Sequence, residues 1–297
     1  MLGTFVGDAI GMPFEGSPPR SFEPPLEMRE GRLGRGAYTD DTQMMIALAE
    51  SLLRNDIVEP ADLRSSFLRA HEPRRGYGAG TEAVFRLWRE GMDDAAPRVF
   101  ADGSFGNGAA MRVAPIAVRF AFDDIVVESQ AGQSASLTHA HPVGIDGAVA
   151  QAAAIAAALN SRSPLAAARA AIRTREFAAA FDLAAEACSA GPDPLRLADA
   201  MGATVASHQS VPVAILIAEA GLDFEESVTL AVACGGDTDT IAAMTGAIVG
   251  ARVGERGIPN RWLAALENGP QGRDYVRALA DRLAKRAARA DTVAGPI

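Results

Sequence analysis

Most of the chain alternates between helical patterns and loops that are rich in glycine or proline. Apolar residues recur at helical spacing within 60–71, behind an initial proline. Two Ala-rich stretches, roughly 144–159 and 164–188, are helical by propensity. Further helices are expected at about 43–54, 81–90, 123–136, 195–208, 211–219, 224–233, 241–253 and 270–289.

No segment of useful length alternates apolar and polar residues in the manner of a β-strand. Residues 211–217 have some β-branched character, but Pro212 and Ala214 favour a helix there. Neither a fixed-period repeat nor a low-complexity linker divides the chain. The pattern therefore predicts one all-α domain over residues 1–297, a compact bundle of many helices with functional loops between them.

Long loops separate several of these helices. In residues 12–37, five prolines and several glycines exclude a regular element. A loop of this length inside a compact domain is usually functional or disordered. Glycine-rich loops follow at residues 76–80, 102–108 and 234–239.

The composition is that of an ordinary soluble enzyme. Of the 297 residues, 48% are hydrophobic and 22% are charged, which allows a sizeable buried core. The net charge of −9 argues against binding nucleic acid through bulk electrostatics. Cys188 and Cys234 are isolated, as is usual in a reducing cytoplasm. Because no signal peptide and no apolar stretch of about 20 residues is recognisable, we expect a soluble, cytoplasmic protein without a membrane partner.

The sharpest chemical feature is a pair of acidic tetrads, 39–42 (TDDT) and 237–240 (DTDT), each beside a predicted helix start. Oxygen ligands of this kind suit Mg²⁺, Mn²⁺ or Ca²⁺ better than Zn²⁺ or copper. Adjacent residues on a helix point apart, so one tetrad alone does not easily hold an ion. The economical arrangement is that both tetrads converge and share a pair of ions.

Helix capping is the alternative explanation of the tetrads, because aspartate and threonine are preferred at helix N-termini. For one tetrad alone, capping would be the commoner explanation. However, capping gives no reason for the second aspartate of each tetrad. The preceding Gly235 and Gly236 also allow the backbone to bend so that Asp237 and Asp239 face one centre.

Six motifs in order resemble those of the ADP-ribosylglycohydrolase family, which includes dinitrogenase reductase-activating glycohydrolases and ADP-ribosyl-acceptor hydrolases. They are GDAIG at 7–11 followed by Glu15, TDDT at 39–42, RGYGAG at 75–80, GNGAAMR at 106–112, Thr138-His139 and GGDTDT at 235–240. The resemblance covers most of the chain. It implies an all-α fold with a binuclear Mg²⁺ or Mn²⁺ centre in a cleft lined by loops.

The same resemblance implies the metal ligands. They would be Thr39, Asp40, Asp41, Asp237, Asp239 and Thr240. Asp239 is the better candidate for bridging both ions, which in the family bind the hydroxyls of the distal ribose. Glu15, on the proline-rich loop, would gate the site, hold a water or act as acid or base. Asp40 and Asp239 are the other catalytic candidates, and Asp8 would stabilise the site without taking part directly.

Substrate contacts implied by the resemblance come from two glycine-rich loops and one histidine: Gly76, Tyr77, Gly78, Ser104, Phe105, Gly106, Asn107, Gly108 and His139. Backbone N–H groups of such loops can cradle a diphosphate, and an aromatic ring can stack on adenine. Taken alone, glycine loops are more often plain turns, and a lone histidine before a helix is usually a cap. His141 is expected to be structural. Phe105 stands where some relatives carry tyrosine, and the usual first helix is shortened.

The implied function is hydrolysis that releases ADP-ribose from a modified acceptor, with ADP-ribosyl-arginine on protein favoured. Serine, nucleic-acid base and O-acetyl-ADP-ribose linkages remain open. A non-catalytic ADP-ribose-binding module is a further alternative, since jellyfish-lens crystallins also resemble the family. A metal-dependent phosphohydrolase is another, and it would release phosphate or AMP. The chain lacks the G-x-S-x-G, G-K-[ST] and H-E-x-x-H motifs of other enzyme classes.

Overall fold

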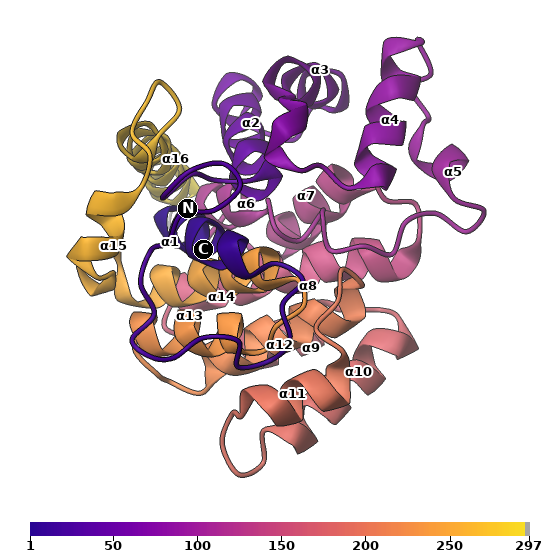
Figure 1. Cartoon of the computed structure of the whole chain (residues 1–297). Coiled ribbons are helices and arrows are strands. Elements are labelled where there is room, and N and C mark those ends of the chain that lie inside the picture. Colours follow the sequence, from indigo (N-terminus) through magenta and orange to yellow (C-terminus); the bar gives the residue numbers. More distant parts are fainter. Residues whose placement is uncertain (295–297) are drawn as a thin grey trace.

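The structure is a computed structural model that describes residues 1–294. These residues form α-helices joined by loops, with three short 3₁₀ helices and one isolated β-bridge between Gly106 and Ala206 (Figure 1). The predicted all-α fold is therefore confirmed. The α-helices are α1 (Leu2–Gly11), α2 (Asp40–Asn55), α3 (Pro60–Ala70), α4 (Ala79–Arg89), α5 (Ala96–Val99), α6 (Ala114–Arg119), α7 (Asp124–Ser136), α8 (Pro142–Leu159), α9 (Pro164–Ala171), α10 (Arg175–Ala187), α11 (Pro194–Met201), α12 (Ser207–Glu219), α13 (Phe224–Ala233), α14 (Thr238–Val253), α15 (Asn260–Ala265) and α16 (Arg273–Ala294).

One hydrophobic core runs through the described residues, and the Ala-rich helix α8 lies inside it. Its small side chains allow close packing against α7, α9, α12 and α14. By length and composition, α8 is the one described helix that could cross a membrane. Core helices of soluble proteins pass the same test, and 83% of α8 is buried inside the protein. Its apolar character is accounted for by its place in the core.

Helices α1 and α14 are in especially close contact and bring the two ends of the fold together (Figure 1). Gly3, Gly7 and Gly11 are spaced four residues apart, so they lie on one face of α1. A Cβ atom at any of these positions would overlap backbone atoms of α14, and at Gly7 it would meet the carbonyl of Ala242. The glycines are therefore required by backbone approach, which places Asp8 beside the start of α14.

The Ala-rich stretch 164–188, which propensity predicts as continuous helix, is interrupted between α9 and α10. The Asp146 carboxylate of α8 accepts hydrogen bonds from the backbone N–H groups of Arg173 (3.0 Å) and Thr174 (2.6 Å). Because the buried Asp146 side chain accepts these N–H groups, they do not need the helical hydrogen bonds to preceding carbonyls, and the helix is interrupted. The interruption is thus a tertiary effect that alanine propensity does not reveal.

The boundaries of the next helices also differ from the prediction. The stretch 195–208 is not one helix, because α11 ends where Gly202 takes a left-handed conformation with φ of 87°. Helix α12 then begins at Ser207 and continues through Pro212. The apolar character expected at 211–217 is helical, as Pro212 and Ala214 indicated. Helix α1 was not identified from periodicity at all, because every one of its residues is buried and it shows no polar face.

Candidate functional site

The two acidic tetrads, far apart in sequence, lie together at the starts of α2 and α14. The Thr240 hydroxyl is 3.5 Å from Asp41 Oδ1, a long contact that joins the tetrads directly. Burial, and then neighbouring carboxylates, raise the pKa values of Asp41 and Asp239 well above their usual range. The same causes raise the pKa of Asp40 to about 8. The tetrads therefore converge into one buried, acidic centre.

Capping of α2 is carried out by residues other than the two aspartates of the first tetrad. The Thr39 side chain accepts a hydrogen bond from the Asp41 N–H. Asp8 of α1 accepts hydrogen bonds from the N–H groups of Thr39 (3.0 Å) and Thr42 (3.1 Å) and from the Thr42 hydroxyl (2.6 Å). Helix α14 has no side-chain cap at all. The capping explanation thus accounts for Thr39 and Asp8 at α2 and leaves Asp40 and Asp41 for another role. At α14, Asp239 Oδ1 accepts the Thr240 N–H at 2.9 Å, which leaves its second carboxylate oxygen and Asp237 unexplained by capping.

Asp8 is fully buried, and burial raises its pKa to about 6 while its hydrogen bonds from Thr42 and Thr39 oppose that rise. Its carboxylate satisfies backbone donors that would otherwise be orphaned at the first turn of α2. Asp8 therefore fixes the start of α2 against α1, in agreement with the supporting role expected for it.

The second tetrad is positioned by the glycine pair before it. Gly235 and Gly236 have φ of 73° and 68°, a left-handed conformation that favours glycine. Gly236 exchanges backbone hydrogen bonds with the long loop, donating to Ser17 (2.9 Å) and accepting from Gly16 (2.8 Å). Asn107 then donates a 2.6 Å hydrogen bond to Asp237 Oδ2. Three separate loops consequently meet at the start of α14.

The negative charge of the centre is not neutralised by direct ion pairs, although the Arg32 charge lowers the pKa of Asp40 from a distance. Among the described residues, no salt bridge reaches an aspartate of either tetrad. Asp41 Oδ2 is sealed from solvent and receives no hydrogen bond. A buried carboxylate in this state is costly unless a cation or a proton accompanies it. The chemistry of the donor set, oxygens only, therefore fits a hard divalent cation.

The side chains do not form a closed cage as they stand. Within the described part of the chain, no group of three or more His, Cys, Asp or Glu side chains is arranged to hold a metal ion. Threonine hydroxyls from both tetrads lie among the carboxylates and would add further oxygen ligands.

Glu15 follows a short 3₁₀ helix, Met12–Phe14, at the start of the long loop, and its half-exposed side chain faces the acidic centre. Burial raises the pKa of Glu15, the Arg32 guanidinium lowers it, and the Asp237 carboxylate raises it. Arg32 Nη2 lies 3.9 Å from Glu15 Oε2 and donates to the Arg75 carbonyl at 3.1 Å, while Arg32 Nη1 donates to the Arg74 carbonyl at 2.9 Å. Arg32 thus links Glu15 to the loop before α4. No sequence motif predicts this role of Arg32.

The two glycine-rich loops differ in what they offer a ligand. The Phe105 ring is 50% exposed and lies 5.8 Å from the His141 ring and 6.2 Å from the His208 ring. By contrast, Tyr77 is buried, and its hydroxyl donates to Gln43 Oε1 at 2.7 Å. Stacking on adenine, expected of Phe105 or Tyr77, is therefore available to Phe105.

The neighbours of Phe105 and Tyr77 complete both loops. Ser104 Oγ accepts the N–H of Gly106, Asn107 donates its backbone N–H to Val205, and Gly106 and Gly108 flank the His139 ring. Gly76 lies against the Arg32 guanidinium, whereas Gly78 at the start of α4 faces open space. His141 caps α8 by accepting the Val143 N–H, as expected of a structural histidine.

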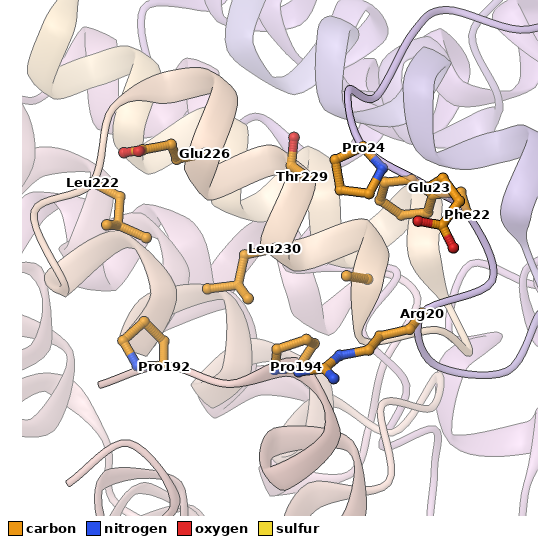
Figure 2. A pocket seen from close by; sticks show the side chains of 11 residues that line it. Arg20, Phe22, Glu23, Pro24, Pro192, Pro194, Leu222, Glu226, Thr229 and Leu230 are labelled. Atoms are coloured by element: carbon orange, nitrogen blue, oxygen red, sulfur yellow. The ribbon is translucent and has the colours of Figure 1, made fainter. Parts of the chain in front are cut away.

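A separate cavity of about 490 Å³ lies between the long loop and α13 (Figure 2). In Figure 2, Pro24 of the loop lies near Thr229 of α13, Arg20 reaches toward Pro194, and Pro192 lies on the same side as Pro194. None of the site residues predicted from the sequence lines this cavity, whose walls are Arg20, Phe22, Glu23, Pro24, Pro192, Pro194, Leu222, Glu226, Thr229, Leu230 and Ala233.

The fold and the site together define an all-α protein with an oxygen-rich acidic centre beside a glycine-rich loop that carries an exposed aromatic ring. The sequence pattern of the ADP-ribosylglycohydrolase family matches residues 1–292. The chain belongs to the ADP-ribosylglycohydrolase family, which is a family of enzymes. The resemblance identified from six motifs is thereby confirmed.

Relatives extend over nearly the whole chain. An uncharacterized protein of Archaeoglobus fulgidus is 37% identical, covering 95% of this chain and 94% of that protein. ADP-ribosylhydrolase ARH3 of Homo sapiens is 30% identical, with 90% and 88% covered. ADP-ribosyl-[dinitrogen reductase] glycohydrolase of Rhodospirillum rubrum is 27% identical, also with 90% and 88% covered. A solved structure titled "ADP-ribosylglycohydrolase-related protein complex" superposes with a TM-score of 0.78 at 29% identity, covering 96% of this chain and 95% of that one.

Proposed function

We propose that this protein hydrolyses the bond between ADP-ribose and a modified acceptor, and that the acceptor is an arginine side chain of a protein. The observation that carries the proposal is the buried acidic centre of α2 and α14. Within the described residues its aspartates form no ion pair, and Asn107, two residues from the exposed Phe105, donates a hydrogen bond to it. The name of the R. rubrum relative, which refers to an ADP-ribosylated protein, supports a protein acceptor.

The acidic centre would hold two Mg²⁺ or Mn²⁺ ions through Thr39, Asp40, Asp41, Asp237, Asp239 and Thr240. When bound, such ions would supply Lewis acidity and orient the distal ribose. This assignment is supported by the all-oxygen donor set and by the unpartnered Asp41 Oδ2.

The remaining steps fall mainly to side chains outside the tetrads. Phe105 stacks on adenine, and those N–H groups of the 104–108 loop that are not bonded within the protein bind the diphosphate. Water attacks the anomeric carbon as the bond from that carbon to the acceptor nitrogen breaks. The water proton passes to the Glu15 carboxylate. The guanidinium of the substrate departs as neutral guanidine and then takes up a proton from solvent, to which Glu15 releases its own. Asp40 and Asp239 are alternative proton acceptors. Glu15 is preferred because its side chain is 48% exposed and can exchange its proton with solvent.

The test is release of free ADP-ribose from an arginine-ADP-ribosylated protein, with Mg²⁺ or Mn²⁺ and then with EDTA. We expect metal-dependent release, and Glu15→Gln should lower kcat by about 10²–10⁴-fold, the usual scale for a general base. Glu23→Gln, on the same loop but in the wall of the separate cavity, is the matched control.

Parallel substrates separate the alternatives. Release only from serine-linked, base-linked or O-acetyl-ADP-ribose substrates would replace the arginine acceptor and keep the reaction class. Release of AMP or phosphate instead of intact ADP-ribose would identify a phosphohydrolase. Binding of ADP-ribose without turnover of any substrate would identify a binding module.

A further inference from the structure

Arg112, the last residue of the GNGAAMR motif, is a fully buried arginine with an unusual set of partners. Its guanidinium donates to the carbonyls of Gly108 (3.1 Å) and Ser134 (3.0 Å) and to Thr138 Oγ1 (2.8 Å). It also lies over the Phe67 ring, 4.8 Å from the centroid. Among the described residues, no carboxylate forms a salt bridge with it. Its contacts instead direct one N–H group at the threonine that precedes His139.

The hydrogen bonds around Thr138 determine where its hydroxyl proton goes. Thr138 Oγ1 lies 2.8 Å from His139 Nδ1 as well as 2.8 Å from Arg112 Nη2. A hydroxyl has one proton to donate, whereas a guanidinium can only donate. If Nδ1 also carried a proton, two donors would face Oγ1 and the buried hydroxyl would have no acceptor among the described residues. All three groups are satisfied only when the hydroxyl donates to Nδ1.

The second ring nitrogen of His139 must then carry the ring proton. His139 Nε2 makes no hydrogen bond with the described residues, yet it is not among the polar atoms sealed from solvent. A Cβ atom on Gly106 or on Gly108 would lie 3.7 Å from Nε2, so this nitrogen borders the glycine-rich loop closely. Burial, and then the charge of Arg112, lower the pKa of His139 to about 3, which keeps the ring neutral.

We propose that Arg112 and Thr138 are positioning residues that fix His139 as a neutral Nε2–H donor for an anionic oxygen of the ligand, the diphosphate of ADP-ribose. The identity of the ligand rests on the proposed function; the assignment of the proton does not. In the opposite tautomer, the Nε2 lone pair would face the same oxygens and repel them. We call the chain of hydrogen bonds from Arg112 through Thr138 to His139 the relay. The relay makes the glycine-rich loop selective for a ligand that only accepts hydrogen bonds at this position.

The proton assignment can be measured without any ligand. The chain has four histidines, so ¹⁵N-histidine labelling gives a small set of ring resonances, and the resonances missing in His139→Gln identify His139. Long-range ¹H–¹⁵N spectra distinguish a protonated from an unprotonated ring nitrogen. We expect His139 in wild-type protein to show a protonated Nε2 and an unprotonated Nδ1 at neutral pH. A protonated Nδ1 in the wild-type protein would overturn the proposal.

Three variants test the relay. Thr138→Val removes the hydroxyl while keeping the shape of the side chain, so His139 should no longer be held in the Nε2–H tautomer. Thr138→Ser keeps a hydroxyl and should retain that tautomer. Thr245→Val is the matched control, because the Thr245 hydroxyl is buried and has no hydrogen-bond partner. We expect Thr138→Val to raise the Kd for ADP-ribose and the KM about tenfold, with kcat nearly unchanged, and Thr138→Ser to restore both.

Two results separate this proposal from the proposed function. If Thr138→Val keeps the Nε2–H tautomer, or if Thr138→Ser fails to restore it while folded, the relay is wrong. If the wild-type tautomer is as assigned but ADP-ribose does not bind, the positioning of His139 by Arg112 and Thr138 is retained. The assignment of the ligand and the proposed function are then wrong.

Discussion

The first acidic tetrad, at the start of α2, and the second, at the start of α14, have nearly the same composition but are held by different means. The first is fixed by side chains, because Asp8 and Thr39 satisfy the N–H groups of the first turn of α2. The second is fixed by backbone, because Gly235 and Gly236 turn the chain and α14 lies against the glycine face of α1. Asn107 then restrains Asp237 alone.

This difference shows that one sequence pattern can stand at two helix starts that are stabilised differently. Thr39 and Asp8 accept the hydrogen bonds of the first turn of α2, whereas the residue before α14 makes no capping hydrogen bond. The shared consequence is a cluster of buried carboxylates whose pKa values are raised. If the proposed metal centre is correct, the two tetrads are equivalent in ligation and unequal in how they depend on the rest of the fold.

The largest expected effect tests equivalence in ligation. Asp41→Asn and Asp239→Asn should each lower kcat by at least about 10³-fold, the scale of losing a group that stabilises charge in the transition state, and should weaken Mn²⁺ binding measured by calorimetry. Asp223→Asn is the matched control, because Asp223 truly caps a helix, α13, and asparagine caps as well. Near-normal activity in either tetrad variant would show that its tetrad is not a ligand.

A second prediction concerns the backbone support of the second tetrad. Gly7→Ala would place a Cβ against the Ala242 carbonyl, and overpacking of this kind costs about 3 kcal/mol or more of unfolding free energy. For a chain of this size, the midpoint of thermal unfolding should fall by about 6–12 °C. Gly78→Ala, where a Cβ meets nothing, is the control. If Gly7→Ala is as stable as Gly78→Ala, the close approach of α1 and α14 is wrong.

A third prediction follows from the raised pKa values of Asp8 (about 6) and Asp40 (about 8). Between pH 4 and 8 these two groups bind more protons in the native protein than in the unfolded chain, so their contribution to the free energy of unfolding falls as pH rises. His139, whose pKa is lowered from 6.5 to about 3, contributes in the opposite sense, but it is one group against the raised carboxylates of both tetrads. For Asp8 alone the change is on the order of 3 kcal/mol. Urea unfolding in EDTA should therefore show greater stability at pH 5 than at pH 8.

Added Mg²⁺ or Mn²⁺ should reduce this difference, because a bound cation favours the ionised carboxylates. Exposed carboxylates with lowered pKa values, such as Asp124, lose their stabilising effect only below about pH 4, outside this window. Greater stability at pH 8 than at pH 5 in EDTA would contradict the burial of charge at the tetrads.

The smallest effect separates the supports of the two tetrads. The Asp8 carboxylate accepts hydrogen bonds from Thr39 and Thr42, and Asp8→Asn replaces one of its oxygens with an amide that donates. The affinity for the metal should therefore fall by about 10–100-fold, as for other residues that orient metal ligands. Asn107→Ala removes the hydrogen bonds of the Asn107 side chain to Asp237 and Ser210. Because only one of them reaches the centre, the affinity should fall less, by about 5–10-fold. Calorimetric titration with Mn²⁺ compares them. An equal or larger loss in Asn107→Ala would reverse the order of the two supports.

Much of the fold was readable from local patterns, and the failures have local causes. Helices with a proline start or a mixed apolar and polar face, such as α3 and α8, fall close to their expected ranges. The break between α9 and α10 was missed because Asp146, on another helix, supplies the acceptor. Helix α1 was not read from its own pattern, and only the family resemblance implied a shortened first helix; all of its residues are buried.

In the candidate site, too, local motifs were predictable from the sequence and contacts between distant residues were not. Motif resemblance indicated the tetrads, Glu15, the glycine-rich loops and His139, because these residues carry recognisable chemistry. It assigned no role to Arg32 or to the Thr138 hydroxyl, which act through contacts with residues distant in sequence. It also offered Tyr77 and Phe105 as equal stacking residues. Only packing distinguishes them, since Tyr77 lies in an aromatic cluster with His71 and Phe85.

By itself the sequence determined an all-α chain, an oxygen-only set of acidic residues, and membership of a family, because helix propensity, turn residues and ligand chemistry are local properties. The tertiary structure decided which helix starts meet, which residues cap them and which ring nitrogen of His139 carries the proton. Those properties depend on the glycines of α1, which allow the backbone of α14 to approach closely, and on hydrogen bonds between residues that are distant or adjacent in the chain. Most of these contacts join residues far apart in the chain, so no local pattern records them.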